Sequence, residues 1–413
     1  MALATSVCLQ LTLTVAGSES GRDTITASRI GSSQVSFSVE VVTRAGLESC
    51  AVWRSMFAGE RKDHRYYEIV EDALPDNFEY RYFAIRDGGG RIRAVQPFFL
   101  IDQDIVEGVT PVYVRWVSLV RRVYPRFLKL RTLMVGCSAG EGHLACADDL
   151  PATATAELLS RDIVKHARAL GADLIVLKEF PACYREALEC FVRAGFARAP
   201  FMPMTKLNID YDSFDAYIST ALSGNARRHL RKNLRATAGE RIRMSVTDDV
   251  TGLIDEIYPL YLQVYERSKL HFEKLTKDYF RQLSVRMKDK VRFLLWHRGN
   301  RLAAFGMYMI QGDQLFSEYL GFDYAVALDL HLYHYMVRDV TTWAIERRFK
   351  WIRSSSLNYD PKLHFGHQLD PIDLYVRHVS PMVNPVMKVA LRWLQPVRYD
   401  ATLKKFRNYR DLW

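Results

Sequence analysis

The chain has 413 residues, of which 49% are apolar and 12% aromatic, enough to bury the cores of two or three domains. Fifty-seven Lys and Arg against 47 Asp and Glu give a formal charge of +10, which favours polyanionic partners such as nucleic acids, nucleotides or anionic lipid surfaces. No apolar run has the length of a membrane-spanning helix. The six cysteines include no CxxC pair, which favours a reduced, cytoplasmic protein.

Residues 1–32 precede the first regular pattern. The first 17 are mildly apolar but lack the basic start of a secretory signal, so we do not expect a cleaved signal peptide. Ser, Thr and Gly are frequent throughout, which predicts a poorly ordered extension.

The first half of the remaining chain predicts a mixed α/β domain over 33–210. Its elements, in order, are a strand (35–42), two helices (44–57, 64–74), a hairpin around Gly88–Gly90 (80–87, 92–101), a strand (128–136), a helix (153–170), a strand (172–177), a helix (184–195) and a strand (201–209). Residues 102–130 insert extra chain after the hairpin. Gly171 stands where a helix commonly ends.

The second half repeats this plan over 211–380. Its elements are two helices (258–269, 277–288), a hairpin (291–297, 301–310), a strand (314–321), a helix (329–349), a strand (351–356), a short helix (359–366) and a strand (372–378). Two copies of one domain are expected, each a mixed sheet flanked by helices. Residues 381–413 form a basic amphipathic tail, which either packs across the domains or lies on an anionic membrane surface.

This order of elements resembles the GNAT acyltransferase fold. "ALECFVRAGF" (187–196) resembles the GNAT segment in which a helix ends at Gly-Phe before the next strand. Two such domains in tandem resemble the Fem-like peptidyl and aminoacyl transferases and the related BioF2-like acetyltransferases. The stretches 213–235 and 358–378 resemble the opening and closing motifs of the second domain in the latter group.

The resemblance covers residues 35–395. It implies two tandem GNAT-like domains of the α/β class, each with a mostly antiparallel central sheet. It also implies transfer of an acyl or aminoacyl group to an amine, with no metal or tightly bound cofactor.

A GNAT domain holds coenzyme A by directing backbone N–H groups of a glycine-rich loop at the pyrophosphate. In the first half "GCSAGEGH" offers Gly136, Gly140 and Gly142, but Glu141 would repel a pyrophosphate and the spacing departs from RxxGxG. In the second half the loop 321–330 has one glycine, and Asp329 stands near the expected helix N-terminus. A glycine-rich loop without a ligand remains the alternative.

The typical GNAT proton donor is a Tyr four residues before the glycine of the last helix. The first half has Phe191 there, which cannot donate a proton, and the second half has Lys362, with Tyr359 one turn earlier. A lysine can stabilise developing negative charge, so we expect the chemistry in the second half. The alternative is that Lys362 caps a helix C-terminus. Glu318 either faces a cleft as base or amine binder or faces solvent.

The stretch "NARRHLRKNLR" (225–235) predicts a basic helix. Five residues fall within one arc of roughly 140°: Arg227, Arg228, Arg231, Lys232 and Arg235. Between 227 and 243 the sole acid is Glu240, so no i,i+4 ion pairs offset this charge. Phosphate contact is predicted, with a plain basic surface as the alternative. No aromatic platform accompanies the helix, so recognition of single-stranded bases is not expected.

Two histidine pairs, His331 with His334 and His364 with His367, lack reinforcing Cys or carboxylate spacing, so no metal site is predicted. Three functions remain. The first is transfer from acyl-CoA to an amine-bearing small molecule or peptide. The second is transfer from aminoacyl-tRNA, which the basic helix favours. The third is a non-catalytic protein that binds a glycan or cell-wall precursor. DNA is not an expected partner.

Overall fold

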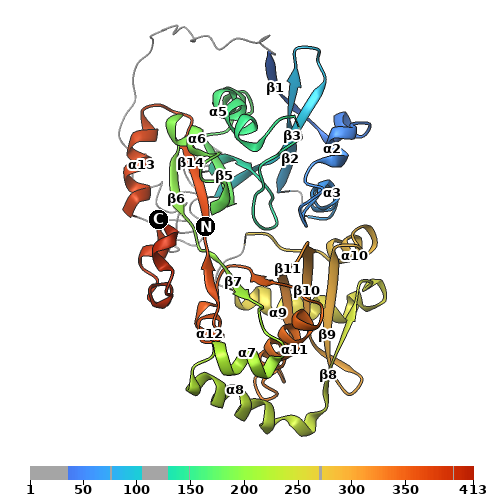
Figure 1. Ribbon diagram of the computed structural model, residues 1–413. Coiled ribbons are helices and arrows are strands. Elements are labelled where there is room, and N and C mark those ends of the chain that lie inside the picture. The colour runs from blue at the N-terminus through green and yellow to red at the C-terminus, as the bar shows by residue number, and fades with distance from the viewer. Residues whose placement is uncertain (1–35, 75–76, 105–128, 148, 269–271, 394) are drawn as a thin grey trace, which may run out of the picture.

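The computed structural model describes residues 36–74, 77–104, 129–147, 149–268, 272–393 and 395–413. They form two seven-stranded sheets with helices on both faces, one domain above the other in Figure 1. The expected fold class is confirmed: two tandem mixed α/β domains with mostly antiparallel sheets. The expected extension (1–32) and most of the insertion (102–130) lie outside the described residues.

The first sheet has the order β1-β2-β3-β4-β5-β14-β6. Its strands are β1 (Phe37–Val42), β2 (Phe78–Asp87), β3 (Ile92–Asp104), β4 (Lys129–Val135), β5 (Leu174–Pro181), β14 (Ile372–His378) and β6 (Ala197–Pro200). The second sheet has the order β13-β7-β12-β11-β10-β9-β8. Its strands are β13 (Gln368–Asp370), β7 (Met204–Asn208), β12 (Trp351–Ser354), β11 (Gln314–Phe322), β10 (Arg301–Gln311), β9 (Val291–Arg298) and β8 (Ile242–Thr247).

The two sheets exchange one strand each. β14 comes from the end of the second half of the chain but pairs between β5 and β6 of the first sheet. β7 comes from the end of the first half but pairs between β12 and β13 of the second sheet. Figure 1 shows both strands passing between the domains. The sequence halves 33–210 and 211–380 therefore each complete the sheet of the other.

Helices cover both faces of the first sheet. Trp53 of α2 (Ala51–Ser55) packs edge-on against Tyr82, with ring centroids 5.0 Å apart. On the opposite face His166 of α5 (Ala152–Ala169) contacts Phe83 at 5.7 Å. The short α6 (Glu189–Arg193) packs on α5.

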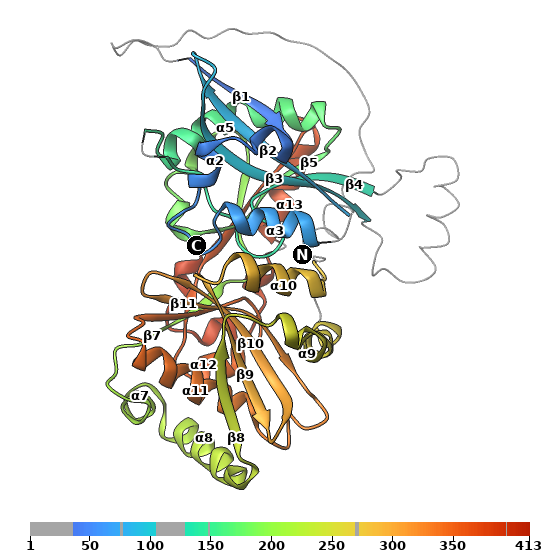
Figure 2. The same cartoon turned by 90° about the vertical axis from the view of Figure 1, so that its right-hand side faces the viewer.

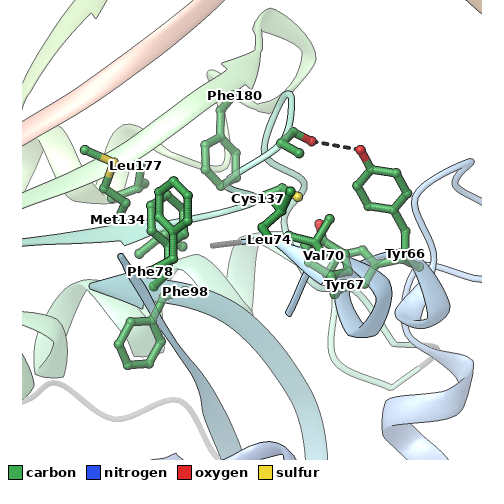
Figure 3. Close-up of a cluster of buried hydrophobic side chains, with 14 of the residues drawn as sticks. Tyr66, Tyr67, Val70, Leu74, Phe78, Phe98, Met134, Cys137, Leu177 and Phe180 are labelled. Atoms are coloured by element: carbon green, nitrogen blue, oxygen red, sulfur yellow. Dashed lines mark hydrogen bonds between the residues drawn. The ribbon is translucent and has the colours of Figure 1, made fainter. Parts of the chain in front are cut away.

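The helix α3 (His64–Ala73) has Asp63 as its N-cap, whose side chain accepts from the Arg65 backbone N–H. Figure 3 shows its buried side chains Tyr66 and Tyr67 beside Cys137, with Phe98 and Phe180 nearby. The Tyr66 hydroxyl donates to the Ala139 carbonyl oxygen at 3.1 Å. The loop that follows β4 is thus fixed directly to α3.

The second sheet is covered in the same way. On one face lie α9 (Ile254–Arg267) and α10 (Lys277–Arg286), where Tyr261 contacts Tyr319. On the other lies α11 (Leu332–Glu346), whose Asp339 accepts from the Trp296 indole N–H at 2.9 Å. The remaining elements are α7 (Phe214–Ala221), α8 (Gly224–Ala236), α12 (Tyr359–His364) and the 3₁₀ turns η4 (Ala238–Glu240) and η5 (Thr251–Leu253).

The domains share a packed junction. Figure 2 shows α3 of the first domain directly above α10 of the second. The hydroxyl oxygens of Tyr66 and Tyr279 lie 2.7 Å apart there, and Arg65 pairs with Asp289 at 2.8 Å. One hydrophobic cluster runs from α3 through to Phe305 of β10. The domains are therefore joined by core packing as well as by exchanged strands.

Four predicted helices differ from those observed. α9, predicted over 258–269, begins four residues earlier, at Ile254. The one over 44–57 is a 3₁₀ turn, η2 (Arg44–Leu47), followed by α2. On one straight helix Leu47 and Trp53 would point about 120° apart, and the break lets both reach the core. The one over 184–195 reduces to η3 (Ala182–Tyr184) and α6. α11 begins at Leu332, three residues later than expected.

The tail forms α13 (Val383–Trp393) and the turns η6 (Pro396–Arg398), η7 (Leu403–Lys405) and η8 (Tyr409–Leu412). One face of α13 packs on β14 and β6 of the first domain. The turns pack around Tyr359 and Leu369 of the second half. The tail therefore packs across both domains. No helix of the described residues is long and apolar enough to cross a membrane.

Candidate functional site

Each sheet contains one parallel pair among its described strands. The β4–β5 ladder ends at Val135/Leu177, and the β11–β12 ladder ends at Ser317/Ser354. Beyond these points the strands part, and their backbone groups need other partners. In open α/β sheets ligands bind outside the carboxyl ends of parallel strands. The residues that follow the two ladders meet at the domain junction, which makes that junction the candidate site.

Four buried charged residues form what we call the junction cluster: Arg61, Lys62, Glu141 and Glu318. Arg61 and Lys62 precede α3, Glu141 follows β4, and Glu318 lies on β11 of the other domain. Arg61 Nε lies 2.5 Å from Glu318 Oε1, and Arg61 also pairs with Glu141. Lys62 Nζ lies 2.8 Å from Glu141 and 3.3 Å from Glu318. None of the four side chains exceeds 8% exposure.

Pairing with opposite charges keeps Arg61, Lys62 and Glu141 ionised. Burial alone would lower the pKa of Arg61 and of Lys62, but attraction to Glu141 and Glu318 outweighs burial and raises both. Burial likewise opposes ionisation of Glu141, and Arg61 and Lys62 hold its pKa well below the usual range. His143 extends the cluster, with Nε2 3.3 Å from Glu141 Oε1. Two cations and two carboxylates therefore hold the domains together electrostatically.

The loop 136–143 is closely packed against neighbouring residues and does not form an open phosphate-binding loop. Gly140 has φ +95°, and a Cβ there would collide with Lys62 Nζ. A Cβ at Gly142 would lie 2.7 Å from the Lys178 carbonyl oxygen. Lys178 Nζ donates to the Gly140 carbonyl at 2.8 Å. The alternative of a glycine-rich loop without a ligand therefore fits the geometry better, because Gly136, Gly140 and Gly142 are required for close packing.

Lys362 lies at the β11–β12 end. Its Nζ donates to the carbonyl oxygens of Ser355 at 2.5 Å and Leu357 at 2.9 Å. Leu357 and Asn358 have φ of +74° and +51°, a left-handed conformation that costs free energy in non-glycine residues. Burial lowers the pKa of Lys362 to about 7. The expected alternative, a helix C-cap, is wrong, because the amine bonds to the turn before α12.

Glu318 and Ser355 are the first residues past the last ladder pair, so Glu318 and the Lys362 amine lie at the same strand ends. Among the described residues no hydrogen bond or ion pair joins them. Glu318 does not face solvent, which excludes one of its two expected placements. Tyr359 is buried and its hydroxyl donates to the Pro203 carbonyl at 2.8 Å. Burial raises its pKa.

Sequence reasoning missed Arg61, Lys62 and Glu273. "GERKDH" (59–64) has the mixed charge of an exposed loop, and the chain separation from Glu318 hides the pairing. Glu273 accepts from the Tyr319 hydroxyl at 3.0 Å, and burial raises its carboxyl pKa, opposed in part by Lys178. Pairing of buried charges across 257 residues leaves no local pattern.

The basic helix is observed as α8, with its N-cap at Ser223. Leu230 and Asn233 are its buried residues, facing α11, while Arg228, Arg231, Lys232 and Arg235 are exposed and Arg227 is half-buried. Arg231 lies 3.5 Å from the exposed Asp215, and among the described residues the other four form no ion pair. Figure 1 shows α8 at the lower edge of the second domain, away from the junction. The phosphate prediction stays a prediction.

The other candidates fall outside the junction. Asp329 does not cap α11, because His331 takes the N-cap position in a left-handed conformation. Burial and then the charges of His229 and His331 lower the pKa of His334 to about 4. The described residues contain no group of three His, Cys, Asp or Glu able to hold a metal. Phe191 is a core residue, edge-on to Phe196 at 5.1 Å.

Comparison with known proteins gives a family. The FemAB-like family model, described as peptidoglycan biosynthesis/recognition, matches residues 115–356. No curated protein matches the chain.

Similar solved structures include FemX, with 12% identity, TM-score 0.48 and coverage of 81% of this chain and 96% of that one. L-PGS from Bacillus licheniformis has 11% identity, TM-score 0.48 and coverage of 81% and 97%. A tandem GNAT protein from the clavulanic acid biosynthesis pathway has 11% identity, TM-score 0.45 and coverage of 84% and 99%.

Proposed function

The chain belongs to the FemAB-like family, and on that premise we propose that it transfers an acyl or aminoacyl group to an amine of a peptidoglycan precursor. The chemistry is assigned to the carboxyl end of the β11–β12 pair. One observation carries this assignment: a buried amine with a pKa of about 7 lies where two parallel strands part. Strongly shifted pKa values of this kind cluster at functional sites.

Lys362 suits the stabilisation of negative charge. When the acceptor amine attacks the donor carbonyl, the C–N bond forms and the carbonyl oxygen becomes an oxyanion. As the C–N bond becomes an amide, the bond to the leaving oxygen or sulfur breaks, and the proton that the amine loses ends on that leaving atom. An ammonium has three N–H donors, and two are used by Ser355 and Leu357. The third is assigned to the oxyanion or the leaving group.

Glu318 and Tyr359 are assigned positioning roles. Both oxygens of Glu318 face cations of the first domain, so it is poorly placed to take a proton from the amine. Its contacts hold β11 against the first domain. The hydrogen bond from the Tyr359 hydroxyl to the Pro203 carbonyl fixes the start of α12. It thereby positions Lys362, one turn later, relative to the strand ends.

Two regions of the molecule bear on which acyl or aminoacyl donor is used, the loop 136–143 and the helix α8. Close packing of the loop 136–143 removes the argument for a coenzyme A pyrophosphate there. The exposed, largely unpaired basic face of α8 supports a polyanionic carrier, so aminoacyl-tRNA is the favoured donor and acyl-CoA the second candidate. A non-catalytic protein that binds a cell-wall precursor is the remaining alternative.

A direct assay tests the proposal. The purified chain is incubated with a peptidoglycan precursor peptide and with either total aminoacyl-tRNA or acetyl-CoA, and mass spectrometry detects the modified amine. Product from aminoacyl-tRNA that RNase pretreatment abolishes supports the favoured donor. Product from acetyl-CoA alone supports the second. Precursor binding without product from any donor contradicts a transferase.

A further inference from the structure

α13 has one buried and one exposed apolar face. Its buried side holds Asn384, Met387, Ala390 and Leu391 against the first domain. The opposite side holds Val386 (41% exposed), Val389 (58%) and Trp393 (70%). Together with Met382 (50%), which directly precedes the helix, these residues form what we call the α13 stripe. At 100° per residue these four positions fall within an arc of about 60°. Figure 1 shows α13 on the outer flank of the first domain.

Aromatic residues extend the α13 stripe. Tyr399 is 67% exposed and its hydroxyl donates to the Trp393 carbonyl at 2.6 Å, so the two lie side by side. Trp413 is 37% exposed, and the Arg398 guanidinium covers its ring at 4.1 Å. Exposed Trp and Tyr at the edge of an apolar surface are typical of contact with the interface of a lipid bilayer.

The charged residues in the same segment of the chain indicate what binds to the α13 stripe. Residues 381–413 contain seven basic residues and two acidic ones, Asp400 and Asp411. The basic ones are Lys388, Arg392, Arg398, Lys404, Lys405, Arg407 and Arg410. Within the described part of the chain none of the seven forms an ion pair, and all but Lys388 are exposed. An apolar stripe on a helix that also carries Lys388 and Arg392, followed in the chain by further unpaired cations, matches an anionic lipid surface.

We infer that the α13 stripe and the basic segment after it bind the surface of an anionic lipid bilayer. A second copy of the chain is the main rival occupant. In a two-fold contact the same patch faces itself, so the unpaired cations of both copies would be brought together. Lipid headgroups instead supply the missing negative charge. Because α13 is already packed on β14 and β6, binding needs no folding of the helix.

Vesicle co-sedimentation tests this site. The full chain is mixed with vesicles of phosphatidylcholine alone or of phosphatidylcholine with one quarter phosphatidylglycerol. Binding to the anionic vesicles is expected. The double variant Val386→Asp/Val389→Asp should weaken it at least tenfold, because two apolar contacts become charged. The triple variant Lys404→Gln/Lys405→Gln/Arg407→Gln should weaken it about fivefold for each charge removed.

Two matched controls distinguish the site from bulk properties. Leu328→Asp changes another exposed apolar residue (73% exposed), and Arg228→Gln/Arg231→Gln/Arg235→Gln removes three charges from α8. Both should keep lipid binding within twofold of the wild type. An equal decrease in the α8 triple variant, or equal binding to both vesicle types, would overturn the proposal. So would a lipid-free dimer that Val386→Asp/Val389→Asp converts to a monomer in light scattering.

Discussion

The two parallel strand pairs show how one fold can serve two purposes. At the end of β4–β5 the gap is filled by the loop 136–143, and Lys178 uses its amine to hold the Gly140 carbonyl. At the end of β11–β12 no glycine loop fills the gap, and Lys362 holds a turn through two carbonyls. The first end is closed by packing and charge pairing. The second end keeps the amine of Lys362, whose pKa lies near neutral pH, and we therefore assign the chemistry to this end.

The largest expected effect concerns the ion pairs that join the two ends. Glu318→Ala leaves Arg61 and Lys62 with one buried carboxylate, and removing one partner of a buried ion pair costs about 3–5 kcal/mol. Denaturant unfolding should show that loss of stability. Asp313→Ala, which breaks an exposed pair with Lys350, is the control and should cost less than about 1 kcal/mol. Similar small decreases in both variants would show that the junction cluster does not hold the domains together.

The second prediction compares the two lysines directly. Lys362→Met should lower turnover about a hundred- to thousandfold, or about 2.7–4 kcal/mol of barrier, with little change in donor affinity. Lys178→Met removes a similarly buried amine at the other strand end and should act through stability alone. Kinetics on folded protein of each variant check this. If Lys362→Met keeps more than about a third of wild-type turnover, the chemistry must be sought elsewhere.

The third prediction uses the pKa of Lys362. An unfolded lysine loses its proton near pH 10.5, whereas folded Lys362 loses it near pH 7. Between these values the unfolded chain binds more protons, so stability should rise with pH, by up to about 1.4 kcal/mol per unit. Below pH 7 the contribution should be flat. Chemical denaturation gives the free energy of unfolding of the wild type and of Lys362→Met at pH 6 to 10, and the difference between them is the contribution of Lys362. If both free energies change with pH in the same way, the shifted pKa is contradicted.

The smallest effect on stability is expected at α8, far from both strand ends. Replacing Arg227, Arg228, Arg231 and Arg235 with Gln should change the melting temperature little, because exposed charges contribute little to folding. Binding of tRNA should weaken, and its salt dependence should flatten by about 0.7–0.9 for each phosphate that is no longer neutralised. Unchanged binding with an unchanged salt slope would leave α8 a plain basic surface.

The periodicity of apolar residues predicted most strands and the tandem plan, because each strand and helix buries one face locally. It could not predict that β7 and β14 exchange sheets, since alternation marks a strand without naming its partner. Lys362 was found through its spacing from Gly366, a local signal. Arg61 and Lys62 were missed because their partners lie 257 and 79 residues away in the chain. Local patterns therefore predicted elements, and distant charge pairing stayed hidden.

The exchange of β7 and β14 also bears on how the chain folds during synthesis. β6 has β14 as its strand neighbour in the first sheet, so it can pair there only after residue 378 has left the ribosome. Domains of most proteins fold in turn, the N-terminal one first. In this chain the first sheet lacks β14 until most of the second half has been translated. The sheet whose strands are synthesised first is therefore completed last, by the final strand of the described chain.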